Sequence, residues 1–395
     1  MLTREIYGLM MVGMMLLMAG CSTDDVVRET TSAQGIAISF NCNYDNEEEN
    51  ETRTADHDAT GITRTGQQGA MNTEDLYATG FGVMASVTAG NAAPYDNKPN
   101  LMYNQAVKYT FVGDMDNPLT GYWSYQPVKY WPTDLEHCYI SAYAPYQELP
   151  IADPETTTGI YGLSTNSKAP YVDYRRCEKP NEVVDLMWYY KDFGESELIP
   201  AAGTLKMKMH HALARLEIKV AMASAPASGT KMLIENITLT GQMAKTGRLH
   251  LYEQKTEGSG NNIKYYPVWS NQTYDLDHTI EITNKDNDAG SYGIIDSQVR
   301  YIKGLPYAWQ PEGLSTTAQN ALSTGDRQGY VYLIPQDELN LTVTVKYHQM
   351  TEGSDKKTTT SSTLRIPKPT EEVPNPPLKG NTTYTLNVTL KEITG

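Results

Sequence analysis

Hydrophobic and polar residues alternate along several short stretches of this chain, and the clearest run over residues 36–44, 137–143, 212–220, 339–347 and 384–390. In an extended chain successive side chains point to opposite faces, so a period of two places the hydrophobic set on one face of a strand. Each stretch is therefore predicted to be a β-strand that buries one face. Few windows repeat with the period of a helix, and the chain is expected to be nearly all β.

The segments between these strands are rich in residues that end strands. The region around Thr63-Arg64-Thr65 follows no period and is rich in Gly and Gln, so it is predicted to be an exposed loop. Residues 145–180 are also predicted to be loop-like, whereas residues 76–87 are predicted to form a strand or strand pair. Glu235-Asn236 is expected to mark a bulge in a strand over residues 232–240. Many short strands with Gly, Pro and Asn turns indicate β-sandwiches.

The N-terminus carries a targeting segment. An apolar run, Ile6–Ala19, follows a short start with Arg4, and it is shorter than the roughly 20 residues that a membrane span needs. It is typical of a secretory signal peptide over residues 1–20. Ala19-Gly20-Cys21 resembles a bacterial lipobox, whose cysteine is diacylated before the leader is cut away. Cys21 is therefore the expected lipidation site and the first residue of the mature chain, followed by a polar tether over residues 21–35.

The residues after the lipobox indicate where the mature chain resides. Ser22-Thr23-Asp24-Asp25 resembles the export signal of Bacteroidetes surface lipoproteins, which implies the outer face of the cell outer membrane. An ordinary signal peptide with a chance cysteine is the alternative. The net charge of the whole chain is −15. An acidic surface repels the phosphates of nucleic acid, so we expect no nucleic-acid partner.

The mature chain is long enough for two domains. A loop-rich connector ends near residue 203 and a new alternating run begins, so we expect an N-terminal β-sandwich domain over residues 36–200 and a C-terminal one over residues 201–395. The run over residues 206–220 could instead close the first domain, which would move the boundary to residue 224.

The cysteines do not indicate a disulfide framework. If Cys21 is acylated, Cys42, Cys138 and Cys177 remain, and these three cannot all pair within one chain. We expect them to be small buried residues of the hydrophobic cores.

No residue pattern points to catalysis, a metal ion or a cofactor, and the chain is not expected to be an enzyme. His210 and His211 would point to opposite faces of a strand, so one packed and one exposed imidazole are expected rather than a shared metal ion. Asp286–Gly290 lacks the distal glutamate of a calcium loop and is expected to be a turn. The aromatic residues between positions 122 and 131 could stack on sugars but are expected to pack the sandwich and its rim.

Six pieces of sequence, taken in order, resemble the fimbrillin family of Bacteroidetes, which includes major and minor fimbrial subunits. Beside the lipobox and the first strand with its following Thr52-Arg53-Thr54, they are Val128–Pro132, Ile140–Pro145, His211–Leu216 and Lys379–Tyr384. The ordered set covers nearly the whole mature chain. The resemblance implies two tandem transthyretin-like or Ig-like β-sandwich domains.

The family resemblance also implies how the protein works. Such proteins are lipoproteins, are trimmed by an arginine-specific protease and polymerise by donating a strand to the next subunit. Arg53 and Arg64 are then the candidate cleavage sites, residues 36–44 the strand that is released, and residues 382–390 the candidate donor. The chain is thus expected to be a stalk, tip or anchor subunit of a surface fimbria that supports cell adhesion.

Two alternatives to a fimbrial subunit remain at this point. One is a monomeric surface lipoprotein that binds glycan or host protein. The other, an enzyme acting on polysaccharide, is the least supported, because no pair of carboxylates is singled out by the sequence.

Overall fold

The computed structural model describes residues 35–44, 62–65, 73–88, 98–112, 121–131, 137–177, 184–194, 200, 203–222, 230–260, 263–281, 293–295, 331–337, 340–351, 358–366 and 378–390. By its contacts the chain divides at Gly35, and all described strands lie in the unit Ile36–Gly395. The described elements are β-strands with one short helix, α1 (Thr73–Thr79), which confirms the predicted all-β class. The described strands form three sheets.

The first sheet is buried on both faces in its middle. Its order is β1-β10-β9-β6-β3-β4-β5. In β6 the predicted alternation is confirmed, because Cys138, Ile140 and Ala142 lie in one core cluster. Tyr143 of the same strand belongs to a second cluster, as expected for neighbouring residues of a strand. The bounds of the strands are β1 (Ser39–Tyr44), β3 (Phe81–Thr88), β4 (Met102–Phe111), β5 (Gly121–Ser124), β6 (His137–Ala144), β9 (Met187–Gly194) and β10 (Thr204–His211).

The second and third sheets contain most of the C-terminal half. The second has the order β15-β11-β18-β2, with β2 (Ile62–Thr65), β11 (Ala214–Met222), β15 (Val331–Leu333) and β18 (Thr382–Leu390). The third has the order β17-β16-β12-β8-β7, and β13 and β14 also pair with β12. Its strands are β7 (Gly159–Leu163), β8 (Tyr171–Arg175), β12 (Thr230–Glu257), β13 (Lys264–Glu281), β14 (Gly293–Ile295), β16 (Asn340–Thr351) and β17 (Thr358–Ile366).

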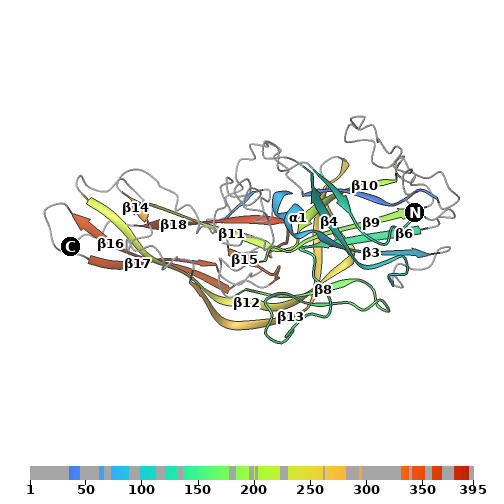
Figure 1. The fold of residues 1–395 in the computed structure, drawn as a ribbon. Helices are drawn as coiled ribbons and strands as arrows, with labels where there is room; N and C mark the ends of the chain where they lie inside the picture. Colours follow the sequence, from blue (N-terminus) through green and yellow to red (C-terminus); the bar gives the residue numbers. More distant parts are fainter. Residues whose placement is uncertain are drawn as a thin grey trace, which may run out of the picture. The chain divides into compact units, whose positions relative to one another are not determined.

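The long strand β12 organises the third sheet, and Figure 1 shows it running beside β13 as a curved ribbon. The pairing of β12 with β16 shifts register between Ile234 and Asn236, which confirms the predicted bulge at Glu235-Asn236. At Gly241, φ is +144° and a Cβ atom would lie 1.9 Å from the carbonyl oxygen of Asn340. Only glycine fits this close approach of two backbones.

The prediction of a strand over residues 76–87 was right in part, and that of a loop over residues 145–180 was wrong. β3 confirms the strand from Phe81 on, whereas Leu76 lies in α1, which ends directly before Gly80, whose φ of +65° suits a helix C-terminus. The predicted loop over residues 145–180 contains β7 and β8. These strands are short and lie among Gly, Thr and Asn residues, and the pairing of β8 with β12 is what defines them. Val172 and Tyr174 of β8 are buried in the second core cluster.

Strands from both predicted sandwich domains share sheets. From the N-terminal half, β2 pairs with β18, and β8 pairs with β12. The chain leaves the first sheet after His211 and enters the second at Ala214. Sheet membership therefore does not follow a single cut in the chain, and the division into domains at residue 200 stays a prediction.

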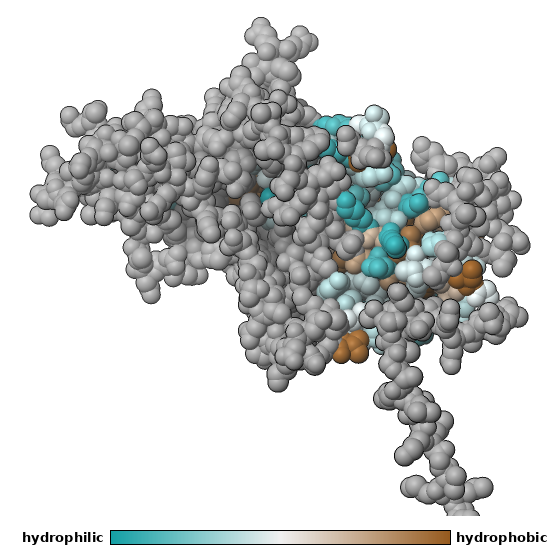
Figure 2. All heavy atoms as spheres, turned by 90° about the horizontal axis from the view of Figure 1, so that it is seen from above, coloured by the Kyte–Doolittle hydropathy of each residue, from teal (hydrophilic) through white to brown (hydrophobic). Residues whose placement is uncertain are grey.

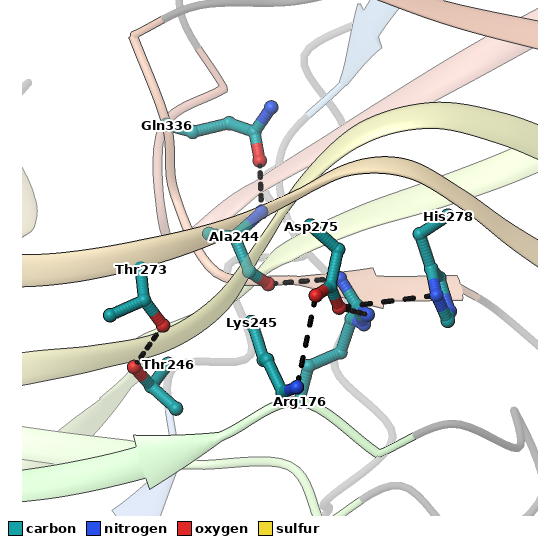
Figure 3. A network of polar contacts seen from close by, with 8 residues as sticks. All are labelled: Arg176, Ala244, Lys245, Thr246, Thr273, Asp275, His278 and Gln336. Carbon is teal, nitrogen blue, oxygen red and sulfur yellow. Dashed lines mark hydrogen bonds and ion pairs between the residues drawn. The ribbon is translucent and has the colours of Figure 1, made fainter.

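A buried arginine fixes the irregular part of β12, as Figure 3 shows. Arg176, 2% exposed, donates from Nη1 to the carbonyl oxygen of Ala244 at 3.1 Å and from Nη2 to Asp275 Oδ2 at 2.8 Å. The pairing of β12 with β13 shifts register directly after Ala244. The side chain of Gln336 accepts from the Ala244 amide at 2.9 Å and donates to the Gln242 carbonyl at 3.1 Å. The interrupted ladder is thus replaced by side-chain hydrogen bonds.

Replacing Arg176 should test this arrangement. Arg176→Ala is expected to lower the free energy of unfolding by about 3 kcal/mol or more, because it strips buried backbone and a carboxylate of their partner. Arg176→Lys should recover only part of this, since an ammonium cannot span both acceptors as the guanidinium does. Lys245→Ala is the matched control: its Nζ lies 3.8 Å from the same carboxylate but its side chain is 51% exposed. Urea unfolding that ranks Arg176→Ala no lower than Lys245→Ala would contradict the role of the buried arginine.

Candidate strand-exchange site

The first strand of the described chain lies at an edge and buries one face. β1 stands at the end of the first sheet, and its only ladder partner among the described strands is β10. Ile38, Phe40 and Cys42 are 2%, 6% and 1% exposed, as the alternation predicted. Ile36, predicted on the same face, is 49% exposed because it precedes the ladder. Burying one large apolar side chain contributes roughly 1.5–3 kcal/mol, so this face holds β1 firmly.

The pairing of β1 with β10 is parallel. Ser39–Tyr44 lie opposite Thr204–Met209 in an unbroken register. The Ser39 amide donates to the carbonyl oxygen of Gly203 at 3.0 Å, and the Ser39 and Thr204 hydroxyl oxygens lie 2.7 Å apart. The two hydroxyl groups therefore mark the register at the start of the ladder.

The opposite edge of β1 is covered by the segment after β5. The Ile38 amide donates to the carbonyl oxygen of Lys129 at 2.8 Å, and the Trp131 amide donates to that of Ile36 at 2.8 Å. This short backbone pairing leaves the rest of the edge to side chains. β1 thus lies between β10 and a loop, so the loop occupies the position of a further strand.

Two aromatic side chains complete this edge. Tyr125 donates its hydroxyl to the Ile38 carbonyl oxygen at 2.8 Å, and Trp123 donates its indole N–H to the Cys42 carbonyl oxygen at 3.3 Å. The Tyr125 hydroxyl in turn accepts from the Lys129 amide at 3.2 Å. We call Trp123 and Tyr125 the aromatic clamp, and the clamp with β10 and the backbone of residues 129–131 the β1 seat. The hydrogen bonds of the clamp reach only main-chain atoms of this strand, and the Tyr125 ring also packs against the Phe40 ring, with centroids 5.5 Å apart.

A glycine lies where the β1 seat begins, directly before β10. At Gly203, φ is +71° and a Cβ atom would lie 2.3 Å from the carbonyl oxygen of Ala37. The carbonyl oxygen of Gly203 accepts from the indole N–H of Trp131 at 2.9 Å, and Trp131 is 3% exposed. A larger residue at position 203 would push the start of β1 away from β10.

The candidate donor, β18, has a second parallel seat. Thr382–Leu390 lie parallel to Ala214–Met222 of β11, and β2 pairs antiparallel with β18 from the other side. Tyr384 is 3% exposed, and its hydroxyl accepts from the Lys379 amide at 2.8 Å. β18 is therefore an inner strand as long as β2 stays in place.

The residues that lead into β18 are anchored on the third sheet and on the turn after β10. Lys379 pairs with Glu257 at the end of β12, and this hydrogen bond holds the pKa of the Glu257 carboxyl below its usual range. The Asn381 amide donates to the carbonyl oxygen of Leu213 at 3.2 Å. A Cβ atom on Gly380 would lie 2.5 Å from the Ala212 carbonyl oxygen. This lead must detach before β18 can leave its sheet.

Of the three candidate processing residues, the structure describes only Arg64. Cys21 and Arg53 lie outside the described residues. Arg64, predicted in an exposed loop, lies in β2 opposite Tyr384 of β18, so the loop prediction for Thr63-Arg64-Thr65 was wrong. The short stretch Ile62–Thr65 gains its strand conformation from a neighbour more than three hundred positions away, which local pattern does not reveal.

The histidine pair is buried, which corrects the prediction of one exposed imidazole. His210 and His211 are 9% and 0% exposed, because the first sheet is covered on both faces here. His211 Nδ1 lies 2.7 Å from Asp185 Oδ2, and both groups are buried. The His210 ring packs against the rings of Trp188 and Tyr265, with centroids 5.7 and 5.2 Å away. The pair therefore holds the end of β10 to its neighbours.

The predicted aromatic group packs mainly into the protein. Trp131 is buried, and Trp123 and Tyr125 are partly buried against the first core cluster, whereas Tyr122 is 47% exposed. On the face drawn in Figure 2, hydrophobic residues are scattered among hydrophilic ones. The sequence indicated these aromatics through their density, but it gave no sign that two of them bind the backbone of β1.

The remaining candidate features give no further site in the described chain. Cys42, Cys138 and Cys177 are buried, as predicted, and none of the three is in a disulfide bond. Among the described residues no group of three or more His, Cys, Asp or Glu side chains could hold a metal ion. Asp286–Gly290 lies outside them. No helix in the part that the structure describes is long and apolar enough to cross a membrane.

Comparison with known proteins agrees with this architecture. This chain is 22% identical over 245 residues to the fimbrium subunit Fim1C of Phocaeicola vulgatus, a stretch that covers 60% of this chain and 56% of that relative. The chain thus matches little more than half of the relative's length. A crystal structure of a fimbrial protein from Bacteroides vulgatus superposes with a TM-score of 0.55 at 18% identity, covering 90% of this chain and 95% of that one. At this identity the likeness concerns the fold alone.

A family-wide comparison also covers most of the chain. The model of the family described as fimbrillin-like matches residues 51–395, which include every described strand except β1. This confirms the resemblance found in the sequence, and the chain belongs to the fimbrillin-like family.

Proposed function

We propose that the chain is a structural subunit of a surface fimbria that is exported as a lipoprotein, trimmed after an arginine and assembled by β-strand donation. The observation that carries this proposal is the position of β1: an edge strand with an apolar face, held by one ladder and a loop. In the fimbria the subunit supports cell adhesion, at a stalk, tip or anchor position.

Release of β1 would create a binding groove without disturbing the other sheets. Its departure breaks the ladder with β10 and leaves the other described strand pairs intact. The groove would be lined by the apolar residues that Ile38, Phe40 and Cys42 cover, and by unpaired backbone groups of β10. Such an edge is filled by an extended segment of another subunit through strand addition.

The position of the cut decides how firmly the donor is held. A cut after Arg53 would release β1 and leave β2 on the chain, whereas a cut after Arg64 would divide β2 and uncover one edge of β18. To reach the bond after Arg64 a protease must first draw β2 out of its ladder. We infer that Arg53 is cut more readily and that cutting at Arg64 frees the donor.

The targeting features of the sequence support a position of the subunit at the cell surface. In this proposal the acyl chains on Cys21 anchor it to the outer membrane, and two chains suffice for stable anchoring. Its partners are other fimbrial subunits and, through the assembled fimbria, a host protein or glycan. No catalytic group is part of the proposal.

Trimming should convert the purified chain into polymers. Treatment of the mature chain without its lipidated cysteine, residues 22–395, with an arginine-specific protease is expected to remove β1 and give oligomers of increasing length that persist on dilution. Arg53→Lys should slow the release of β1 strongly, and Arg64→Lys should leave that release intact while reducing polymer yield. Mass spectrometry measures the release of β1, and electron microscopy measures the polymers. A trimmed chain that stays monomeric and binds a sugar array would favour the monomeric glycan-binding alternative.

Lipidation should depend on one residue. Cys21→Ser is expected to give a protein that takes up no labelled palmitate and is lost from the cell surface, because the thiol is the acyl acceptor. Ser22→Ala keeps the thiol and is expected to be labelled normally. Surface display of the Cys21→Ser protein at the wild-type level would refute the anchor.

A further inference from the structure

Two strands far apart in the chain carry the same pattern. β1 with its preceding residue reads Ile38-Ser39-Phe40-Asn41-Cys42, and the centre of β18 reads Tyr384-Thr385-Leu386-Asn387-Val388. Apolar residues alternate with a hydroxyl residue and an asparagine in both. Both strands also pair in parallel with a strand that borders the same turn, β10 before it and β11 after it.

The strands that pair with β1 and β18, which are β10 and β11, also resemble each other at one place. Asn41 lies opposite Lys206 of β10, and Asn387 lies opposite Lys219 of β11. The residues flanking each lysine are apolar, Leu205 and Met207 in β10 and Ile218 and Val220 in β11. Over these three positions the edge of β10 therefore offers β18 a lysine between two apolar residues, as β11 does within its own chain. Outside them the neighbours differ, because Thr204 and Lys208 stand where β11 has Glu217 and Ala221.

We propose that β18 of a second copy enters the β1 seat parallel to β10 in a single register, with Thr385 at the position of Ser39, and that the aromatic clamp holds its main chain. This inference rests on the proposed function and specifies the geometry of the exchange. In this register Thr382–Leu390 spans the positions of residues 36–44, and the ladder with β10 is made by Thr385–Leu390.

The clamp selects the direction of the incoming strand. In β1 the carbonyl groups of Ile38 and Cys42, whose side chains are buried, point to Tyr125 and Trp123. For L-residues, the direction of a strand and its buried face together fix the side to which each carbonyl points. A donor parallel to β10 with its apolar face inward therefore presents the carbonyls of Tyr384 and Val388 to the clamp. A reversed strand would turn them towards β10.

The alternation decides which donor residues face the core. In this register Tyr384, Leu386 and Val388 take the places of Ile38, Phe40 and Cys42, which are 2%, 6% and 1% exposed. A slip of one residue would bring Thr385 and Asn387 to these buried places. A slip of two residues keeps an apolar face inward, so the position of Asn387 opposite Lys206 is what sets this register apart.

The register can be tested with a disulfide. Because the Ser39 and Thr204 hydroxyl oxygens lie 2.7 Å apart, cysteines at these two places would be within bonding reach. Arginine-trimmed protein carrying Thr204→Cys is mixed with a synthetic peptide of residues 380–395 carrying Thr385→Cys. Under mild oxidation the disulfide is expected to form about tenfold faster than with peptides carrying Thr383→Cys or Asn387→Cys. A faster reaction of either control peptide, or none with any, would overturn the register.

The clamp is tested by the rate at which the same unmodified peptide leaves. Tyr125→Phe removes the hydrogen bond to the bound strand and the one from the Lys129 amide but keeps the ring against the core, so the peptide is expected to dissociate about fivefold faster. Tyr122→Phe is the matched control, because this neighbouring phenol is exposed, and its rate should equal wild type. Equal rates for both variants would overturn the clamp. Polymer formation by the trimmed chain is scored separately, so strand donation can hold while the register or clamp fails.

Discussion

The passage of the chain from β10 to β11 through Ala212 and Leu213 is the constraint on which the two strand sites depend. Both side chains are buried, and the Ala212 amide donates to the Leu186 carbonyl oxygen at 2.7 Å. On one side of this step β10 pairs with the first strand, and on the other side β11 pairs with the last. Because only two residues join β10 to β11, the strand that holds β1 and the strand that holds β18 belong to one continuous segment. β1 pairs in parallel with β10, and β18 pairs in parallel with β11.

An edge strand with an apolar face is a hazard that proteins normally cover. Here the outer edge of β1 is covered by a loop, which offers two backbone hydrogen bonds and two aromatic donors instead of a full ladder. Such cover keeps the strand in place while it is intact. It also leaves fewer bonds to break than an inner strand would have, which is the property a releasable strand needs.

Charged and polar groups fix the parts of the fold where the ladders are irregular. Arg176 binds the backbone beside a register shift of β12, and the His211–Asp185 pair lies where β10 ends. These groups need burial and exact partners, unlike the apolar faces, which tolerate many substitutions of similar size. This difference agrees with a shared fold at 18% identity to the fimbrial protein of known structure.

The sequence by itself determined the all-β class, the buried faces of residues 36–44, 137–143 and 339–347, and the bulge at Glu235-Asn236. Each of these follows from a local period of two or its interruption, which the chain carries wherever one face is buried. Ordered motifs spread along the chain also indicated the family.

Only the tertiary structure decided which strands are neighbours. β2, β7 and β8 have weak local patterns and become strands through distant partners, and both histidines are buried because the first sheet is covered on both faces. The binding of the β1 backbone by Trp123 and Tyr125 likewise joins residues on separate segments. A local pattern records which face of a strand is apolar, but the identity of its partner depends on contacts between residues far apart in the chain.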